Sequence, residues 1–351
     1  MNALRLSKAK LGELLEAVMS EAKLIAPVKL DEGVYRFREI EQVSQVATEL
    51  GNTNKPAKEV FLPQTDLLFK FRKEGKEYTI EQPPLPVEPK VLFGVRPCDV
   101  AANAMIDPVY RETFEDSLYA ARRDSTLIIA VWENCPQLGC FCESVQQVMS
   151  NPRGMDVLFT DLGDAYFVEA KTELGEEFLG RHKALFEAAS AEDKAARDAY
   201  VAGVIEKQRV AVDVEGHLVH DKLDKLFDDD YWDEIAESCL GCGICTYLCP
   251  TCHCFDIEDD GTEQQGVRYR TWDSCQFPHF TLETSGHNPR PSRTERVRQR
   301  VMHKFKYFVD RLDVTACVGC GRCVRYCPVN IDIREIINKV KARSLEEAQV
   351  D

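Results

Sequence analysis

The sequence predicts an α+β fold in two domains: an α/β domain over residues 1–215 and a mainly helical domain over residues 216–351. Two observations carry this prediction. In the first range, short apolar runs typical of buried strands alternate with segments of helical periodicity, which favours an α/β domain. In the second range, helical segments flank a cysteine-rich string that occurs twice. With 351 residues, 44% of them hydrophobic, the chain is long enough for two domains with separate cores.

The first range contains both helical and strand patterns. Apolar residues recur at helical spacing from Leu11 to Ile25, which predicts an amphipathic helix. A proline-rich connector follows at residues 81–90. Three short apolar runs are predicted as strands, at residues 91–95, 126–131 and 157–160. Helical segments are predicted at residues 99–119 and 176–206.

The second range is predicted to be rich in helices. One helix near residues 218–237 leads into the first cysteine string. A closing helix begins near Asp332, which has the spacing of a capping box with Glu335. Its apolar stripe is formed by Ile333, Ile336, Ile337 and Val340. Between the two strings lies a long insertion, residues 250–316, which we also expect to be helix-rich.

The repeated string carries the chemistry of the chain. Residues 239–250 and 317–328 each have the pattern C-x2-C-x2-C-x3-C-P, the spacing of a bacterial ferredoxin that binds a cubane iron–sulfur cluster. Glycines at positions 241, 243, 319 and 321 can adopt positive φ and bring backbone amides close to a cluster. Zinc is the alternative, but it favours isolated C-x2-C pairs. The repeat therefore predicts two 4Fe–4S clusters and transfer of single electrons.

The ferredoxin spacing also predicts which thiolate serves which cluster. In two-cluster ferredoxins the fourth cysteine of each string ligates the other cluster. The first cluster is then held by Cys239, Cys242, Cys245 and Cys327. The second cluster is held by Cys317, Cys320, Cys323 and Cys249.

Seven of the fifteen cysteines lie outside this set of eight, and two interpretations of them stay open. They are Cys98, Cys135, Cys140, Cys142, Cys252, Cys254 and Cys275. Free cysteines are often buried as small hydrophobic residues. Closely spaced thiolates also favour an iron–sulfur or zinc centre. A third cluster would take Cys252, Cys254 and Cys275, with Cys142 as the ligand from the first domain.

A basic stretch from Arg290 to Lys306 stands out on an otherwise acidic chain. One interpretation is a solvated helix face. The other is a docking strip for an acidic partner, for which the candidates are Arg293, Arg296 and Arg300.

Composition excludes several classes of function. A net charge of −15 argues against binding to nucleic acid or to an anionic membrane surface. No apolar run is long enough for a transmembrane helix, and the first ten residues lack the apolar core of a signal peptide. An odd number of cysteines, most of them explained by cluster motifs, favours a reducing cytoplasm over a secreted protein.

Several motifs together resemble one family of redox subunits. They are residues 239–256, Tyr269–Gln276, Ser285–Asn288, residues 317–328, Gly94–Asp99 and Cys140–Cys142. The family includes the β subunit of cytoplasmic sulfhydrogenases, which are NAD(P)-linked nickel–iron hydrogenases, and the corresponding iron–sulfur subunit of anaerobic sulfite reductase. The resemblance implies a hetero-oligomer in which this subunit relays electrons between a flavin subunit that handles NAD(P)H and a terminal redox subunit. Related subunits also occur with heterodisulfide reductase. The long insertion resembles the α-helical ferredoxin type of respiratory iron–sulfur subunits, so residues 216–351 are expected to form such a two-cluster domain.

Two other functions compete with the relay. The chain could be a self-contained iron–sulfur reductase whose amino-terminal domain binds a substrate or flavin instead of serving as a scaffold for partners. It could also be a zinc-stabilised interaction module. The first is weakened because no GxGxxG or GxxxxGK[ST] loop is present. The second is weakened by the two complete ferredoxin strings.

Overall fold

A computed structural model describes residues 3–49, 51–132, 137–208 and 217–343. The chain divides into two compact units. Unit 1 consists of Met1–Ala57, Val87–Asp213 and Cys317–Arg322, and unit 2 consists of Lys58–Pro86, Val214–Ala316 and Cys323–Asp351. The boundary predicted between residues 215 and 216 falls in the range 209–216, outside the described residues. Each unit also takes in a segment that is distant in the sequence from the rest of it.

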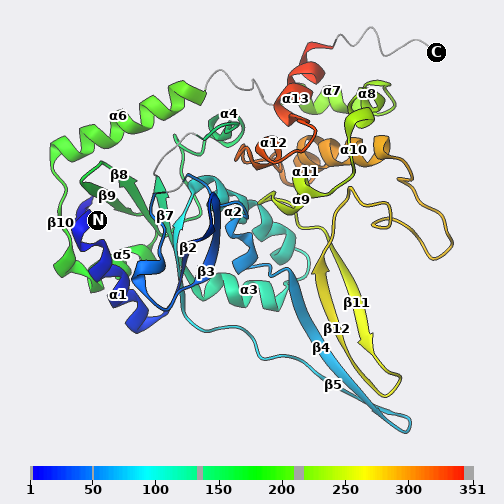
Figure 1. Ribbon diagram of the computed structural model, residues 1–351, viewed down its shortest axis with the longest axis horizontal. Coiled ribbons are helices and arrows are strands. Elements are labelled where there is room, and N and C mark those ends of the chain that lie inside the picture. The colour runs from blue at the N-terminus through cyan, green and yellow to red at the C-terminus, as the bar shows by residue number, and fades with distance from the viewer. Residues whose placement is uncertain (1–2, 50, 133–136, 209–216, 344–351) are drawn as a thin grey trace. The chain divides into compact units, whose positions relative to one another are not determined.

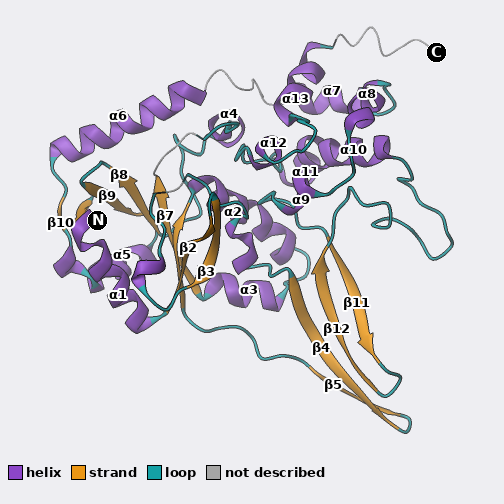
Figure 2. Cartoon of the chain, viewed as in Figure 1, coloured by secondary structure: helices purple, strands orange, loops and turns teal. Residues whose placement is uncertain are grey.

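Unit 1 is built around an eight-stranded sheet in the order β10-β1-β9-β8-β7-β6-β2-β3 (Figure 2). The strands are β1 Leu4–Ser7, β2 Lys23–Asp31, β3 Val34–Glu39, β6 Lys90–Val95, β7 Thr126–Trp132, β8 Val157–Asp161, β9 Ala165–Ala170 and β10 Glu187–Ala188. The four strands β2, β6, β7 and β8 run parallel, and antiparallel strands complete both edges. The three predicted strands are confirmed as β6, β7 and β8. All seven residues of β7 are buried, as expected of a central parallel strand.

The described residues of unit 1 also contain six helices, of which five contact the sheet while α4 contacts α6 (Figure 1). They are α1 Leu11–Glu21, α2 Pro97–Arg111, α3 Ser117–Asp124, α4 Cys142–Gln146, α5 Glu173–Arg181 and α6 Ala191–Gln208. Short 3-10 turns are η1 Lys8–Lys10, η2 Val43–Gln45, η3 Ala57–Val60 and η4 Lys183–Leu185. Leu14, Leu15 and Val18 of α1 join the same hydrophobic core as Val91 and Ile129 of the sheet.

Two helix predictions in unit 1 need correction. The first helix ends at Glu21, and Ile25 belongs to β2, because Leu24 and Ala26 alternate inward with the period of a strand and β2 pairs with β6. The segments 99–119 and 176–206 each form two helices. In the first, the Asp116 side chain accepts a hydrogen bond from the Tyr119 backbone and starts α3 as a new helix.

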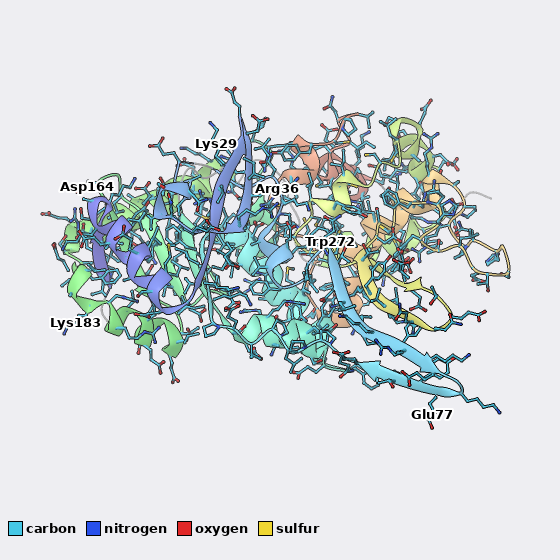
Figure 3. The ribbon with its side chains drawn as sticks, turned by 60° about the horizontal axis from the view of Figure 1, so that its bottom comes forward. Lys29, Arg36, Glu77, Asp164, Lys183 and Trp272 are labelled. Atoms are coloured by element: carbon cyan, nitrogen blue, oxygen red, sulfur yellow. The ribbon has the colours of Figure 1, made fainter. Side chains whose placement is uncertain are left out.

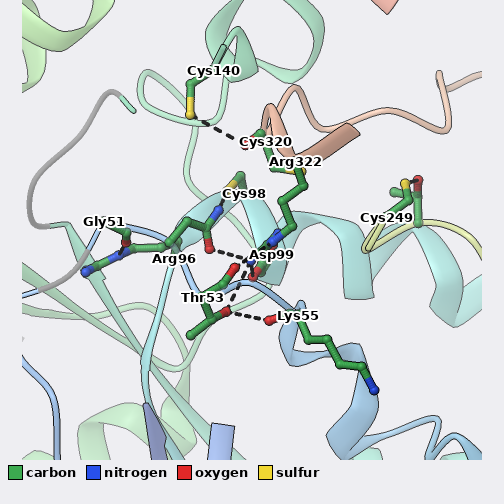
Figure 4. Close-up of polar contacts among 12 residues, drawn as sticks. Gly51, Thr53, Lys55, Arg96, Cys98, Asp99, Cys140, Cys249, Cys320 and Arg322 are labelled. Atoms are coloured by element: carbon green, nitrogen blue, oxygen red, sulfur yellow. Dashed lines mark hydrogen bonds and ion pairs between the residues drawn. The ribbon is translucent and has the colours of Figure 1, made fainter. Parts of the chain in front are cut away.

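The segment Cys317–Arg322 joins unit 1 through a buried ion pair (Figure 4). The Arg322 guanidinium donates to both carboxylate oxygens of Asp99, at 2.5 and 2.7 Å, and both side chains are fully buried. Arg322 Nε also donates to the Thr53 carbonyl at 2.9 Å. Asp99 lies in the first turn of α2, where the helix dipole favours a negative charge. A second link is a backbone hydrogen bond of 2.8 Å from Phe141 to the Gly319 carbonyl.

Unit 2 contains a four-stranded antiparallel sheet in the order β11-β12-β4-β5. The strands are β4 Thr65–Glu74, β5 Glu77–Glu81, β11 Phe255–Gly261 and β12 Gln265–Trp272. Pairing of β4 with β12 brings residues 58–86 into this unit. Figure 3 shows the two hairpins side by side, with Glu77 at the tip of one and Trp272 at the base of the other. The insertion 250–316 is therefore not helix-rich throughout, because its first part pairs with strands from the amino-terminal half.

The other elements of unit 2 are helices. They are α7 His217–Lys225, α8 Tyr231–Ser238, α9 Ile244–Tyr247, α10 Arg293–Met302, a π-helical turn His303–Tyr307, α11 Phe308–Leu312, α12 Arg322–Arg325 (whose first residue is in unit 1) and α13 Ile333–Ala342. The predicted closing helix is confirmed as α13, with Asp332 as its cap and its four stripe residues buried. The helix predicted at 218–237 is divided into α7 and α8. No helix among the described residues is long and apolar enough to cross a membrane.

Replacing Asp99 with Asn should destabilise unit 1 strongly. Removal of one partner leaves the Arg322 charge buried without compensation, which typically costs about 3–5 kcal/mol. Asp124→Asn is a matched control, because Asp124 is largely exposed and pairs with Arg111 at the surface; such pairs are worth about 1 kcal/mol or less. Urea denaturation of the metal-free chain, followed by Trp fluorescence, measures both. Equal midpoint shifts for the two variants would contradict the importance of the buried pair.

Candidate metal centres

A pocket in unit 2 is lined by thiols from both cysteine strings. Cys239 follows α8, Cys245 lies in α9 and Cys327 follows α12, and with Cys242 they line this one pocket. These are the four residues that the sequence assigns to the first cluster. Cys323, assigned to the second cluster, lines the pocket as well. The remaining wall is mainly apolar, with Leu240, Ile244, Val297, Val301 and Ile336 among its residues.

The backbone around these thiols has the conformation expected from the glycines. The four glycines of the strings have positive φ, at 66°, 73°, 61° and 73° for Gly241, Gly243, Gly319 and Gly321. At Gly241 the backbone amide donates to Cys239 Sγ at 3.4 Å. Amide donors of this kind stabilise a thiolate and the negative charge of a bound cluster.

The environment of Arg300, which lines the pocket, shows whether the pocket fits an anionic iron–sulfur cluster. Arg300 is 7% exposed, and its Nε and Nη2 atoms are buried without a hydrogen-bond partner among the described residues. Burial lowers the pKa of Arg300, but the negative charge that the sulfurs of Cys245 and Cys323 carry when ionised outweighs it and raises the pKa well above its ordinary value. A buried cation with free donors is costly unless an anion faces it. The unpartnered guanidinium nitrogens of Arg300 and the surrounding thiols therefore fit an iron–sulfur cluster.

A second thiol group in unit 2 consists of Cys249, Cys252, Cys254 and Cys275. The thiols of Cys249 and Cys252 are hydrogen-bonded to each other, as are those of Cys254 and Cys275. The bond from Cys252 lowers the pKa of Cys249 well below its ordinary value, and the bond from Cys254 lowers the pKa of Cys275 to about 6. Each pair therefore holds two sulfur atoms close together.

Two buried lysines accompany this second group. Lys304 Nζ donates to Cys249 Sγ at 3.2 Å and to the Thr251 hydroxyl at 3.0 Å. Lys58 Nζ donates to the Cys252 carbonyl at 2.6 Å and lies 4.3 Å from the centre of the Trp272 ring. Burial lowers the pKa of Lys58, and the nearby thiols oppose that shift. The group is therefore a dense set of sulfurs with cations placed to balance their charge.

Unit 1 holds a third set of thiols. Cys98, Cys142, Cys317 and Cys320 are buried. Burial raises the pKa of Cys98, and the neighbours Asp99, Cys142 and Cys320 raise it further. Cys142 Sγ donates to the Gln208 side chain at 3.3 Å, and Cys140 Sγ donates to the Cys320 carbonyl at 3.6 Å. Cys135 lies outside the described residues.

Two predicted ligand sets are divided between the units. For the second cluster, Cys317 and Cys320 are in unit 1, while Cys249 and Cys323 are in unit 2. For the third cluster, the predicted ligand Cys142 is in unit 1, near Cys98 and Cys320. The other three predicted ligands, Cys252, Cys254 and Cys275, are in unit 2 with Cys249. Neither unit by itself contains a complete set of four. Among the described residues, no three Cys, His, Asp or Glu side chains form a group that could hold a single metal ion.

Comparison with known proteins agrees with the cysteine pattern. Residues 238–331 match the family model described as a 4Fe-4S dicluster domain. Sulfhydrogenase 2 subunit beta of Pyrococcus furiosus is 30% identical over 344 residues, which cover 97% of this chain and 99% of that protein. The chain belongs to the sulfhydrogenase subunit beta family. It is an iron–sulfur electron-transfer protein with a domain for two 4Fe–4S clusters.

The basic stretch from Arg290 to Lys306 does not form the exposed docking strip that one interpretation of the sequence predicts. Arg296 and Arg300 are buried, so the docking-strip prediction is wrong for them, and only Arg293 of the three candidates is exposed. Arg296 donates to the carbonyls of Arg290 and Pro291, at 3.1 and 2.8 Å. Arg293 donates to the Cys239 carbonyl at 2.7 Å. The spacing of four residues places Arg296, Arg300 and Lys304 on one helix face, which is the buried face.

Several residues that shape the thiol sites were not identified from the sequence. Arg322 lies inside the second string and Asp99 inside the Arg-Pro-Cys-Asp motif, so the motifs contained both partners without indicating their contact. Lys58 had no signal at all, because it lies 194 residues from Cys252. Gln276 belongs to the Trp-Asp-Ser-Cys-Gln motif, and its amide donates to Cys275 Sγ at 3.6 Å.

Replacing Gly319 with Ala should disrupt the second string. An alanine there would keep φ at +61°, and its Cβ would lie 2.5 Å from the Cys142 nitrogen and overlap the Phe141 carbonyl carbon. We expect a loss of about 3 kcal/mol or more, together with a lower iron content. Gly286→Ala is the control: its φ is +84° but no atom lies within 4 Å of the new Cβ, so only about 1 kcal/mol of strain is expected. Urea midpoints and iron analysis compare the two, and equal effects would refute the steric argument.

Proposed function

We propose that this chain relays single electrons inside a hetero-oligomeric complex, between a flavin subunit that handles NAD(P)H and a terminal redox subunit. The observation that carries the proposal is the pocket lined by five cysteines from both strings and by Arg300, two of whose guanidinium nitrogens have no hydrogen-bond partner among the residues that the structure describes. The relative's name identifies it as one subunit of a sulfhydrogenase. This favours hydrogen metabolism over sulfite or heterodisulfide reduction as the terminal reaction. All cysteines that the structure describes are free thiols, which supports a reducing cytoplasm.

The first cluster is proposed to bind Cys239, Cys242, Cys245 and Cys327. When bound, such a cluster accepts and releases one electron at a time. The thiolates would hold it, and the Gly241 amide stabilises the Cys239 sulfur. The presence of Cys327 in this pocket supports crossed ligation between the strings.

The second cluster is proposed to bind Cys317, Cys320, Cys323 and Cys249. The equal spacing of the two strings supports it. Lys304 holds Cys249 in its ionised form, because its ammonium donates directly to that sulfur. Arg322 and Phe141 hold the segment that carries Cys317 and Cys320.

A third cluster is proposed on Cys252, Cys254 and Cys275. Support comes from the second thiol group, where these residues gather beside buried lysines. The fourth ligand is proposed to be Cys142, which belongs to unit 1. A third cluster would raise the iron content from about eight to about twelve per chain.

Crossed ligation predicts a specific pattern of iron loss. Cys327→Ser alone should remove about four irons, and adding Cys239→Ser should remove no more, since both serve one cluster. Adding Cys317→Ser to Cys327→Ser should instead remove about eight. Iron and sulfide analysis after anaerobic reconstitution measures each variant. If instead the variant with Cys239→Ser loses about eight irons and the variant with Cys317→Ser loses about four, each string ligates its own cluster.

The relay function predicts that the isolated chain does not oxidise NADH or NADPH, because its sequence has no dinucleotide fingerprint. The brown reconstituted protein should bleach within seconds once NADH and a flavin-bearing subunit are both added. Anaerobic absorbance of NADH and of the clusters follows the two reactions separately. Dithionite reduction of the chain alone serves as the control for intact clusters. Rapid NADH oxidation by the chain alone would favour the self-contained reductase.

A further inference from the structure

We propose that Arg300 is a positioning residue that sets how readily the centre in the unit 2 pocket is reduced. The inference rests on the proposed function, because it concerns the cluster assigned to Cys239, Cys242, Cys245 and Cys327. It goes beyond it by naming a side chain that is no ligand but controls the energy of electron transfer. Sequence alone suggests a surface role for the same residue.

The first argument is the cost of burying this charge. Arg300 lies on the inward face of α10 and forms no ion pair with a carboxylate among the described residues. Two of its donor nitrogens, Nε and Nη2, are buried and unused. A guanidinium transferred from water to such a site is strongly destabilising unless an anion compensates it. An anionic sulfur centre in the adjoining pocket supplies that compensation.

The second argument is the position of Arg300 relative to the thiols. The charges acting on it come from Cys245 and Cys323 of the pocket and from Cys252 and Cys249 of the second thiol group. It is therefore shared between both sulfur sets of unit 2. Lys304, one helical turn further, donates to Cys249 and so serves the second group. Arg300 is the cation that lines the pocket itself.

The effect on reduction has a definite sign. Uptake of one electron adds one negative charge to the centre, and a nearby buried cation stabilises that charge more than the oxidised state. Hydrogen bonds donated to the sulfurs act in the same direction and are among the factors that set cluster potentials. Because Arg300 is buried and the wall around it is mainly apolar, the low local dielectric screens both interactions less than water would. Removing Arg300 should therefore make reduction less favourable.

The test is a redox titration of the reconstituted full-length chain, monitored by electron paramagnetic resonance. For Arg300→Met we expect unchanged iron content and a reduction equilibrium constant of one centre lower by about tenfold, which is 59 mV for one electron. Arg298→Met is the matched control, because Arg298 lies on the same helix and pairs with the exposed Asp228. It removes the same charge and should leave the potentials unchanged. An unchanged titration of Arg300→Met, or an equal shift in Arg298→Met, would overturn the inference.

Stability provides a second readout. In the metal-free chain, Arg300→Met should be as stable as the wild type or more stable, because burial raises the pKa of Cys245 to about 12, so this neighbour is uncharged and does not compensate the buried guanidinium. A purely structural role predicts the opposite. If Arg300→Met binds less iron, the Arg300→Gln variant distinguishes the two roles, because it removes the charge but keeps a hydrogen-bond donor. Loss of iron in both variants would show that Arg300 acts in cluster assembly and would overturn the inference.

The two proposals fail in different ways. A wild-type chain without any reducible cluster would refute the proposed function itself. Intact clusters whose reduction does not depend on residue 300 would refute only this inference.

Discussion

The buried ion pair between Arg322 and Asp99 is the constraint on which the arrangement of the cysteine strings depends. Arg322 follows the first two cysteines of the second string, and its bidentate contact holds that segment in unit 1. The chain enters unit 2 at Cys323. The position equivalent to Arg322 in the first string is Ile244, which lines the thiol pocket instead. The two strings share their cysteine, glycine and proline positions, and this difference between Ile244 and Arg322 accompanies their different surroundings.

Buried cationic side chains lie next to the cysteine sulfurs. The chain carries a net charge of −15, yet Arg300, Lys304 and Lys58 are buried beside sulfur atoms. Each would be costly in an apolar interior without an anion. Ionised thiols, and the clusters that we propose they bind, are the anions that could balance these charges. These cations offset the concentration of negative sulfur, and for Arg300 we propose that the charge also favours the entry of an electron.

The sequence predicted those elements whose pattern is strong and local. Strands β6, β7 and β8 are continuous apolar runs, because buried parallel strands are covered on both faces. The closing helix has a cap and a regular stripe. Strands β5 and β11 escaped prediction because all their residues are exposed, so no buried face imposes an apolar pattern on them. The end of α1 was misplaced because apolar residues continue without interruption into β2.

By itself, the sequence determined the cluster chemistry, since C-x2-C-x2-C-x3-C-P is a local geometry that a few consecutive residues encode. It determined the family through the same motifs. Tertiary structure alone decided which charges face the thiols. Lys58 reaches Cys252 across 194 residues, and Arg322 reaches Asp99 across 223. Such contacts depend on how distant segments pack, and a linear charge pattern cannot show which face of a helix will be buried.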